Sequence, residues 1–208
     1  MTESPKDAWE ARYKEADRIW SGRVNQVLKD TASALEPGTA LDLGCGEGGD
    51  AVWLASQGWH VTGVDLSETA VSRAEAAASE RGVDAKFIAA DLSTWTTDDR
   101  FDLVSASFLL STHADFPRNE ILRKAATFVA PGGHILVVAH AEAPSWAKFH
   151  AEHAPRFPTP EEDLASLTLD SAAWEVLACE LRPRSALSPD GITTTQLTDT
   201  VVLAKRLG

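Results

Sequence analysis

The sequence predicts an α/β fold in which helices cover both faces of a parallel sheet. From Thr39 onward, short apolar runs alternate with amphipathic segments of helical period, as expected when strands are buried on both sides by crossover helices. A glycine-rich turn follows the first apolar run, and an aspartate follows each of the next two. No helical pattern separates the last two runs, which predicts an antiparallel hairpin at one edge of the sheet.

Length and composition fit one globular domain. The chain has 208 residues, of which 44% are hydrophobic and 24% are charged, values that are usual for a folded domain with a single core. We expect residues 1–208 to form one unit with four parts. These parts are an N-terminal helical cap at 1–38, a core at 39–140, a lid-like insertion at 141–170 and an antiparallel edge hairpin at 171–208.

Charge and composition exclude several classes of partner. The 31 acidic residues outnumber the 19 basic ones and give a formal net charge of -12, which repels polyanions, so we expect no nucleic-acid partner. No apolar run approaches the ~20 residues that span a bilayer, and we expect no membrane segment. The N-terminus lacks a signal-peptide pattern and only two cysteines are present, which favours a cytoplasmic location. The histidine and cysteine spacings predict no metal site.

Turn and capping residues set the expected element boundaries. Two N-terminal helices are expected to meet around 21–22. Ser67 can cap a helix that Gly82 ends, and the residues Thr-Pro-Glu-Glu at 159–162 supply a capping box for a later helix. The strands are expected at 40–43, 60–64, 85–89, 101–106, 135–139, 174–181 and 200–205, with a Pro-Gly-Gly turn at 131–133 before the fifth.

The turn after the first strand has the spacing of a nucleotide-cofactor site. Gly44, Gly46 and Gly49 match the pattern G-x-G-x-x-G, in which glycines allow the backbone to approach a bound ligand closely. Asp65 at the end of the second strand can accept hydrogen bonds from both vicinal hydroxyls of a ribose. Asp91, after the third strand, is placed to accept from an adenine amine. The spacing alone fits a nicotinamide cofactor as well as S-adenosylmethionine.

Acidic residues around the turn distinguish these two cofactors. A nicotinamide dinucleotide would bring a doubly negative pyrophosphate to the turn, whereas S-adenosylmethionine brings a sulfonium cation and no phosphate. Asp42 precedes the first glycine, and Glu47 and Asp50 lie in or just after the turn. Carboxylates at these positions repel a pyrophosphate over a few ångströms and favour S-adenosylmethionine as the cofactor.

Four motifs in order resemble those of the class I S-adenosylmethionine-dependent methyltransferases, over nearly the whole chain. The segment Leu-Asp-Leu-Gly-Cys-Gly-Glu-Gly at 41–48 is similar to the family's first motif almost letter for letter. Residues 63–67 resemble the second-strand motif, 90–92 the adenine-contacting motif, and 101–104 with 122–136 the fourth and fifth strand units. The resemblance implies a Rossmann-like sheet of seven strands in the order 3-2-1-4-5-7-6, with strand 7 antiparallel.

Two N-terminal segments, 9–13 and 20–25, resemble the subgroup that includes tellurite-resistance and thiopurine-type small-molecule methyltransferases. The resemblance implies that the N-terminal helices fold over the methionine end of the cofactor. Cys45, in a tight turn, is interpreted as a small packing residue rather than a nucleophile. The expected cofactor-binding residues are Trp20, Asp42, Gly44, Cys45, Gly46, Asp65, Leu66, Asp91, Leu92 and Ser107.

Methyl transfer needs few catalytic groups, because the sulfonium already activates the methyl and the protein mainly aligns the acceptor and excludes water. If the acceptor must lose a proton, His113 after the fourth strand is the candidate base; a soft anion needs none. Tyr13, Trp146 and His150 are the candidate acceptor-site residues. Residues 105–108 do not carry the Asn-Pro-Pro-Tyr type of sequence found in many enzymes that methylate amino groups of nucleic acids and proteins.

The expected function is methyl transfer to an O, N or S atom of a small molecule. Two alternatives stay open. The glycine spacing also fits a nicotinamide-dependent oxidoreductase. A protein with the same cofactor site could instead act as a non-catalytic S-adenosylmethionine-binding module.

Overall fold

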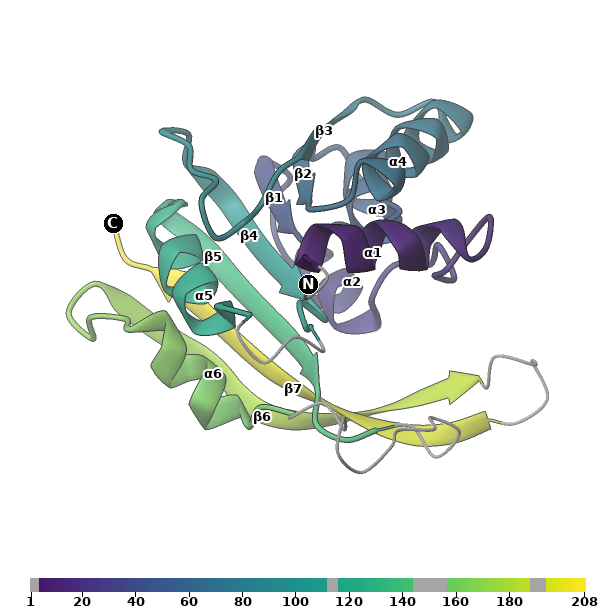
Figure 1. The fold of residues 1–208 in the computed structure, drawn as a ribbon. Coiled ribbons are helices and arrows are strands. Elements are labelled where there is room, and N and C mark those ends of the chain that lie inside the picture. The colour runs from purple at the N-terminus through teal and green to yellow at the C-terminus, as the bar shows by residue number, and fades with distance from the viewer. Residues whose placement is uncertain (1–3, 112–115, 144–156, 188–193) are drawn as a thin grey trace.

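A computed structural model describes residues 4–111, 116–143, 157–187 and 194–208. Within these ranges, seven strands form one sheet in the order β3-β2-β1-β4-β5-β7-β6 (Figure 1). The α/β class and the strand order expected from the sequence are thereby confirmed. The strands are β1 Thr39–Leu43, β2 His60–Asp65, β3 Ala85–Ala89, β4 Phe101–Ser107, β5 Val129–His140, β6 Trp174–Leu187 and β7 Thr194–Arg206.

The central strands run parallel and are strongly apolar. β1 pairs with β2 and β4, β2 with β3, and β4 with β5, all in parallel. β7 runs antiparallel to both β5 and β6, as predicted for this edge. The apolar run at 135–139 is buried throughout, because helices cover both faces of the sheet at β5.

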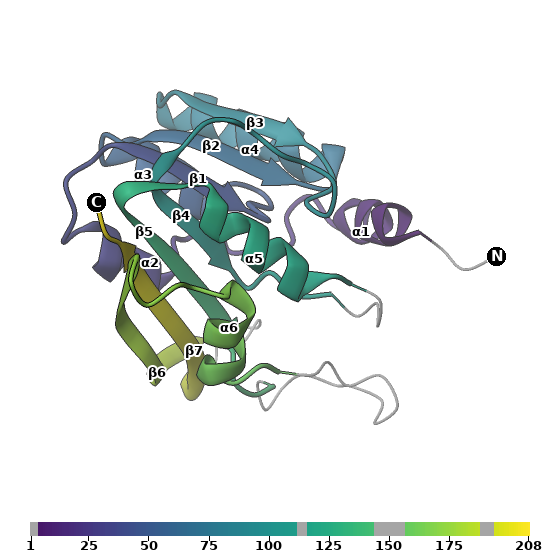
Figure 2. The same cartoon turned by 90° about the vertical axis from the view of Figure 1, so that its left-hand side faces the viewer.

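Helices form a layer on each face of the sheet. The side chains of α2 and α3 pack in one hydrophobic cluster and those of α5 and α6 in the other, and Figure 2 shows these pairs on opposite sides of the sheet. In the same view α1 lies beyond the carboxyl ends of the parallel strands. The helices are α1 Pro5–Lys14, α2 Gln26–Ala32, α3 Gly49–Ser56, α4 Glu68–Arg81, α5 Arg118–Thr127 and α6 Pro160–Leu167.

Several helix ends lie where single residue types predicted them. Ser67 Oγ accepts the amide of Ala70 at the start of α4, and Gly82 ends that helix with a φ of +66°. At α6, both hydrogen bonds of the capping box between Thr159 and Glu162 are present. Side-chain caps satisfy amides that a helix leaves unpaired at its first turn, which is why they can be read from sequence.

Some predicted boundaries were wrong. α1 ends at Lys14 and α2 begins at Gln26, so a long non-helical segment replaces the expected short break at 21–22. β5 begins at Val129 and continues through the expected Pro-Gly-Gly turn at 131–133. Its register with β4 shifts there, which shows that the extra residues are accommodated as a bulge rather than as a turn outside the sheet.

The edge hairpin is longer than predicted. β6 and β7 stay paired from Trp174 and Arg206 out to Leu187 and Thr194, although the threonine run at 193–195 was expected in the loop. Threonine is β-branched and suits a strand with one exposed face, so its polarity alone was a poor indicator of a loop. The expected turn residues at 189–191 lie outside the described ranges.

Neither a membrane helix nor a metal cluster occurs in the part of the chain that the structure describes. No helix there is long and apolar enough to cross a bilayer. No group of three or more histidine, cysteine, aspartate or glutamate side chains is arranged there to hold a metal ion.

A buried ion pair joins α5 to α6. Asp163 on α6 is 1% exposed, and its carboxylate accepts from both terminal nitrogens of Arg118 at the start of α5. The Nε atom of Arg118 also donates to the carbonyl of Leu109 at 2.9 Å. The guanidinium therefore ties both helices to the loop that follows β4.

We predict that Arg118→Met lowers the free energy of unfolding by about 3 kcal/mol, because the carboxylate of Asp163 stays buried without its charged partner. Denaturant unfolding of the purified protein measures this change. Arg123→Met, at an exposed position of the same helix, is the matched control and should change the free energy by less than about 0.5 kcal/mol. Equal effects of the two substitutions would contradict a stabilising role for the ion pair.

Candidate cofactor and acceptor site

The turn between β1 and α3 holds the predicted glycines at the carboxyl edge of the sheet. Gly44 and Gly46 have φ values of +75° and +52°, which residues with a side chain rarely adopt. The amides of Gly44 and Cys45 both donate to the carbonyl of Val64 on β2, at 2.8 and 3.1 Å. The backbone of the turn is therefore held against the end of the neighbouring strand.

The Asp65 carboxylate links this turn to the next one. Its Oδ2 accepts the amide of Gly46 and its Oδ1 accepts the amide of Ser67, each at 2.9 Å. Burial raises the pKa of Asp65, while these amide hydrogen bonds act in the opposite direction. Each carboxylate oxygen can accept a second hydrogen bond. The role expected from the sequence, accepting two vicinal hydroxyls, is compatible with the contacts that Asp65 already makes.

Asp42 on β1 is buried and only half satisfied. Its Oδ1 accepts from Ser105 Oγ at 2.9 Å, whereas its Oδ2 has no hydrogen-bond partner among the described residues. The Oγ atom of Ser107 at the end of β4 is likewise buried without a partner there. Burial and the charges of Asp50 and Asp65 raise the pKa of Asp42 to about 8. Unpaired buried polar atoms are costly and call for an explanation, and a bound polar ligand supplies one.

Glu47 does not present its charge to the turn, which corrects one part of the electrostatic expectation from the sequence. Glu47 is buried, accepts the amides of residues 19–20 and forms an ion pair with Arg73 at 2.7 Å. Asp50 accepts the amide of Asn25 at 2.6 Å, but its charge still acts on Asp42. Both carboxylates hold the N-terminal segment in place, and only Glu47 is neutralised by a cationic partner, so Glu47 opposes a pyrophosphate less strongly than its position in the sequence indicates.

The N-terminal segment crosses the glycine turn. Trp20 Nε1 donates to the hydroxyl of Tyr13 at 3.1 Å. A Cβ on Gly46 would lie 3.2 Å from the Tyr13 oxygen and 3.4 Å from the Trp20 ring, and a Cβ on Gly44 would lie 2.8 Å from Leu109 Cδ1. Tyr13 and Trp20, two residues predicted for the site, thus lie directly at the turn, with Trp20 45% exposed.

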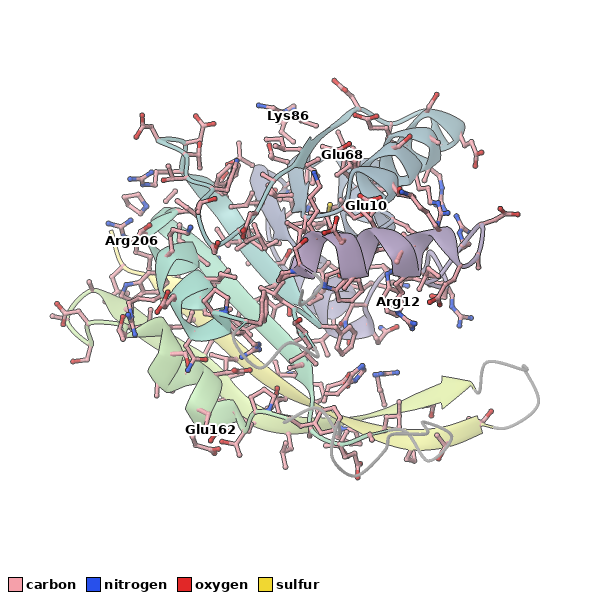
Figure 3. All side chains as sticks on the ribbon, in the orientation of Figure 1. Glu10, Arg12, Glu68, Lys86, Glu162 and Arg206 are labelled. Carbon is pink, nitrogen blue, oxygen red and sulfur yellow. The ribbon has the colours of Figure 1, made fainter. Side chains whose placement is uncertain are left out.

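Helix α1 is attached to the start of α4. Glu10 accepts the hydroxyl and the amide of Thr69 at 2.6 and 3.3 Å, and Lys6 pairs with Glu68 at 2.7 Å. Figure 3 labels Glu10 on α1 and Glu68 at the start of α4. Burial by itself would raise the pKa of Glu10. Hydrogen bonds from the start of α4 outweigh that effect and lower the pKa to about 2. Since α4 begins three residues after Asp65, this contact places α1 beside the carboxylate that is expected to bind ribose.

The other predicted cofactor residues differ in their access to a ligand. Leu66 is partly exposed and Asp91 is exposed, and Asp91 uses one carboxylate oxygen to accept a nearby backbone amide. The side chain of Leu92 is buried in the core, so only its backbone could contact a ligand. The Sγ atom of Cys45 packs against Gly63, and burial raises the pKa of this thiol, in agreement with a packing role.

The predicted acceptor-side residues His113, Trp146 and His150 lie outside the described ranges, and their roles stay predictions. The structure adds a pair that the sequence analysis missed. His140 at the end of β5 places Nδ1 3.2 Å from Oδ1 of Asp199 on β7. The two residues are 59 positions apart and become neighbours only through the antiparallel register, for which the sequence carries no local signal.

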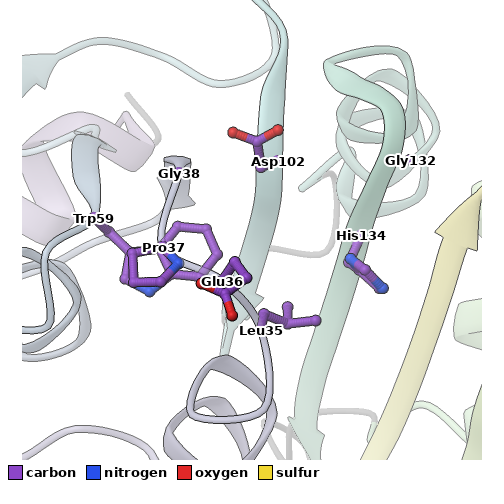
Figure 4. A pocket seen from close by; sticks show the side chains of 8 residues that line it. All are labelled: Leu35, Glu36, Pro37, Gly38, Trp59, Asp102, Gly132 and His134. Carbon is purple, nitrogen blue, oxygen red and sulfur yellow. The ribbon is translucent and has the colours of Figure 1, made fainter.

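A hollow of about 360 Å³ lies at the opposite edge of the sheet, near the amino ends of β1 and β4 (Figure 4). Its lining includes Trp59, Asp102 and His134, and none of the residues predicted for the site. The glycine turn follows β1, whereas this hollow lies before it. We therefore place the candidate site at the carboxyl edge, where the unpaired polar atoms are.

The chain matches a known domain family and known proteins. A family described as "Methyltransferase domain" matches residues 40–133. The chain is 31% identical over 154 residues to the 2-heptyl-1-hydroxyquinolin-4(1H)-one methyltransferase of Mycobacteroides abscessus, a match that covers 69% of this chain and 68% of that relative. The chain belongs to the class I S-adenosylmethionine-dependent methyltransferases.

Two further comparisons show how far this methyltransferase resembles other proteins. It is 33% identical over 156 residues to the ribosomal RNA small subunit methyltransferase C of Alcanivorax borkumensis, but this match spans only 47% of that relative and 66% of this chain. The structure of the N-methyltransferase NodS from Bradyrhizobium japonicum, in complex with S-adenosyl-L-homocysteine, has a TM-score of 0.69 at 19% identity and covers 98% of this chain and 99% of that one. At this level of identity, the comparison with NodS shows that the two proteins share a fold.

The residues of this methyltransferase fit the family's cofactor. The unpaired Oδ2 of Asp42 is an acceptor of the kind that the ammonium of the methionine moiety needs, and Asp65 can accept from a ribose. Because Gly44 and Gly46 lack side chains, Leu109, Tyr13 and Trp20 lie close to the turn and would border a ligand bound there.

We predict that S-adenosylhomocysteine binds about fivefold to tenfold more tightly at pH 7 than at pH 6. Burial raises the pKa of Asp42 to about 8, so at both pH values this carboxyl is largely protonated in the free protein and must lose its proton to pair with an ammonium. The affinity therefore rises with pH until Asp42 is ionised in the free protein, at up to tenfold per pH unit. Calorimetric titration in buffers of different ionisation enthalpy measures both the affinity and the released proton.

Asp42→Asn is the control for this pH dependence, because it removes the titrating group and keeps the shape of the side chain. The variant should bind more weakly, with an affinity that hardly changes between pH 6 and 7. A wild-type affinity that is also independent of pH would show that Asp42 does not pair with the ligand.

Proposed function

We propose that this protein transfers a methyl group from S-adenosylmethionine to an O, N or S atom of a small molecule. The observation that carries the proposal is the pair of buried carboxylates, Asp42 and Asp65, at the carboxyl edge of the sheet, on either side of a glycine turn. One carboxylate has an unpaired oxygen and the other organises two backbone turns. Membership of the methyltransferase family supports the same activity.

In this proposal the chain's residues mainly bind and orient. Asp65 accepts the ribose hydroxyls, Asp42 accepts the ammonium, and Asp91 accepts the adenine amine. Tyr13 and Trp20 cover the turn and exclude water from it. When bound, S-adenosylmethionine supplies a methyl group on a sulfonium, an electrophile that needs no further activation by the protein.

A small acceptor fits this chain better than a nucleic acid. The formal net charge of -12 opposes the approach of a polyanion, and the match to the quinolone methyltransferase spans a larger share of that relative than the match to the ribosomal RNA enzyme does. His113 remains the sequence's candidate for a base, and Tyr13, Trp146 and His150 remain its candidates for contacts to the acceptor. Two free cysteines, Cys45 and Cys179, support the proposal of a reducing, cytoplasmic setting.

We predict that S-adenosylhomocysteine binds the wild-type protein with a micromolar Kd and that Asp65→Asn weakens this binding at least about tenfold. The substitution replaces a charged acceptor of two ribose hydroxyls with an amide that can accept from only one of them. Asp84→Asn, at an exposed position before β3, is the matched control and should bind as the wild type does. Calorimetric titration gives the three constants.

Titration with NADH in the same experiment addresses the alternative cofactor. Binding of NADH without binding of S-adenosylhomocysteine would overturn the proposed function in favour of a nicotinamide-dependent oxidoreductase. Tight binding of S-adenosylhomocysteine with no methylated product across hydroxyl, thiol and amine acceptors, as measured by mass spectrometry, would favour a non-catalytic binding module.

A further inference from the structure

Four side chains from different segments meet at the carboxyl ends of β4 and β5. His140, the last residue of β5, has its Nδ1 3.2 Å from Asp199 Oδ1. Arg184 on β6 donates from Nε to the other oxygen of the same carboxylate at 2.5 Å. The ring of Phe108, which follows β4, is stacked on the imidazole with the centroids 4.1 Å apart and 23° between the planes.

The hydrogen bond to Asp199 determines which nitrogen of the imidazole is basic. Asp199 is 0% exposed, and a buried carboxylate requires donors for both oxygens. Nδ1 of His140 supplies one of them, so in the neutral ring Nδ1 carries the hydrogen and Nε2 carries the lone pair. No described residue hydrogen-bonds to Nε2, and the His140 side chain is 27% exposed. The hydrogen bond to Asp199 therefore makes Nε2 the basic nitrogen of a partly exposed ring.

The loop after β4 connects this imidazole to the cofactor turn. Ser107 has a buried Oγ near the carboxylate of Asp50, with no hydrogen bond of ordinary geometry to a described residue. Phe108 stacks on His140, and Leu109 Cδ1 would lie only 2.8 Å from a Cβ on Gly44. Phe108 also has a φ of +55°, a strained conformation for a residue with a side chain, of a kind often found at functional sites. Two consecutive residues of this loop thus contact His140 and the glycine turn, respectively.

The long hairpin carries Asp199 and Arg184 to this position. The pairing of β5 with β7 ends at His140 and Asp199, whereas β6 and β7 remain paired out to Leu187 and Thr194. The hairpin therefore extends past the carboxyl ends of β4 and β5 (Figure 1). Among the residues that the structure describes, the charged groups shown to face His140 are the carboxylate of Asp199 from β7 and, through that carboxylate, the guanidinium of Arg184 from β6.

We propose that His140 accepts the proton of the methyl acceptor, with Asp199 as its positioning residue, an inference that rests on the proposed function. The acceptor's X–H bond breaks, the proton goes to the lone pair of Nε2, and the electron pair stays on X to form the new bond to carbon. As that bond forms, the bond between the methyl carbon and the sulfonium sulfur breaks, and its electron pair stays on sulfur, which leaves as the neutral thioether of S-adenosylhomocysteine. The imidazolium afterwards gives its proton to water. Arg184 balances the buried charge of Asp199 while the ring is neutral. The acceptor class is a weakly acidic hydroxyl on an aromatic ring, because such a hydroxyl gives its proton to an imidazole more readily than an aliphatic alcohol does.

The test uses 4-nitrophenol, whose anion is yellow and whose neutral form is colourless, so its protonation can be read without turnover. The probe is titrated into the wild-type protein saturated with S-adenosylhomocysteine at about pH 6, where the free probe is mostly in its colourless form. We expect saturable binding in which the bound probe is mostly the yellow anion. His140→Asn, whose amide can still donate to Asp199, should bind the probe within about threefold but with at least tenfold less anion. Asp199→Asn should fall between the two, because it leaves Nε2 in place but removes the charge that holds the ring.

Controls separate the outcomes. His60→Asn, at an exposed position on β2, should leave the colour unchanged, and thermal unfolding shows whether each variant is folded. The assignment is overturned if the wild type binds the probe in its colourless form, does not bind it, or keeps the yellow anion in His140→Asn. Failure to bind S-adenosylhomocysteine at the outset would instead overturn the proposed function, so the two failures are distinguishable.

Discussion

The structure of the site depends on one constraint, which is that the backbone amides exposed by the turn after β1 need acceptors. The carbonyl of Val64 takes two of them and Asp65 takes the next, while the second oxygen of Asp65 takes the amide at the start of α4. One carboxylate thereby fixes two adjacent loops at the carboxyl edge. The same arrangement orients the remaining lone pairs of Asp65 for a ligand. Asp65 thus holds the two loops in place even without a ligand, which explains why its carboxylate is buried.

Much of the fold could be predicted from the sequence, because the strongest determinants are local. Apolar runs gave the strands, Ser67, Gly82 and Thr159 gave helix ends, and the motif resemblance gave the strand order. The failures occurred where tertiary contacts override local preference. A Pro-Gly-Gly sequence is absorbed into β5 as a bulge, and polar threonines pair within β7. The segment at 15–25 stays non-helical and is held there by Glu47 and Asp50, whose amide contacts no periodicity predicts.

The candidate site was predictable on the cofactor side and not on the acceptor side. The glycines, Asp42 and Asp65 lie within one motif and one strand end, so spacing alone brings them together. The acidic residues around the turn correctly indicated S-adenosylmethionine rather than a nicotinamide dinucleotide. Glu47 does not contribute to this preference as expected, because it pairs with Arg73. On the acceptor side, His140 meets Asp199 only through antiparallel pairing, and that register depends on long-range packing. Residues that are close in sequence can be recognised as a motif, whereas residues that meet only across paired strands can be found only once the fold is known.

The fate of a labelled methyl group distinguishes a small-molecule methyltransferase from the alternatives. Wild-type protein is incubated with methyl-labelled S-adenosylmethionine and the ultrafiltered small-molecule fraction of a cell extract, in parallel with the ribosomal RNA and protein fractions. We expect label in a small-molecule product, dependent on Asp42 and Asp65. Label that enters only RNA or protein, or none in any fraction, would contradict this expectation.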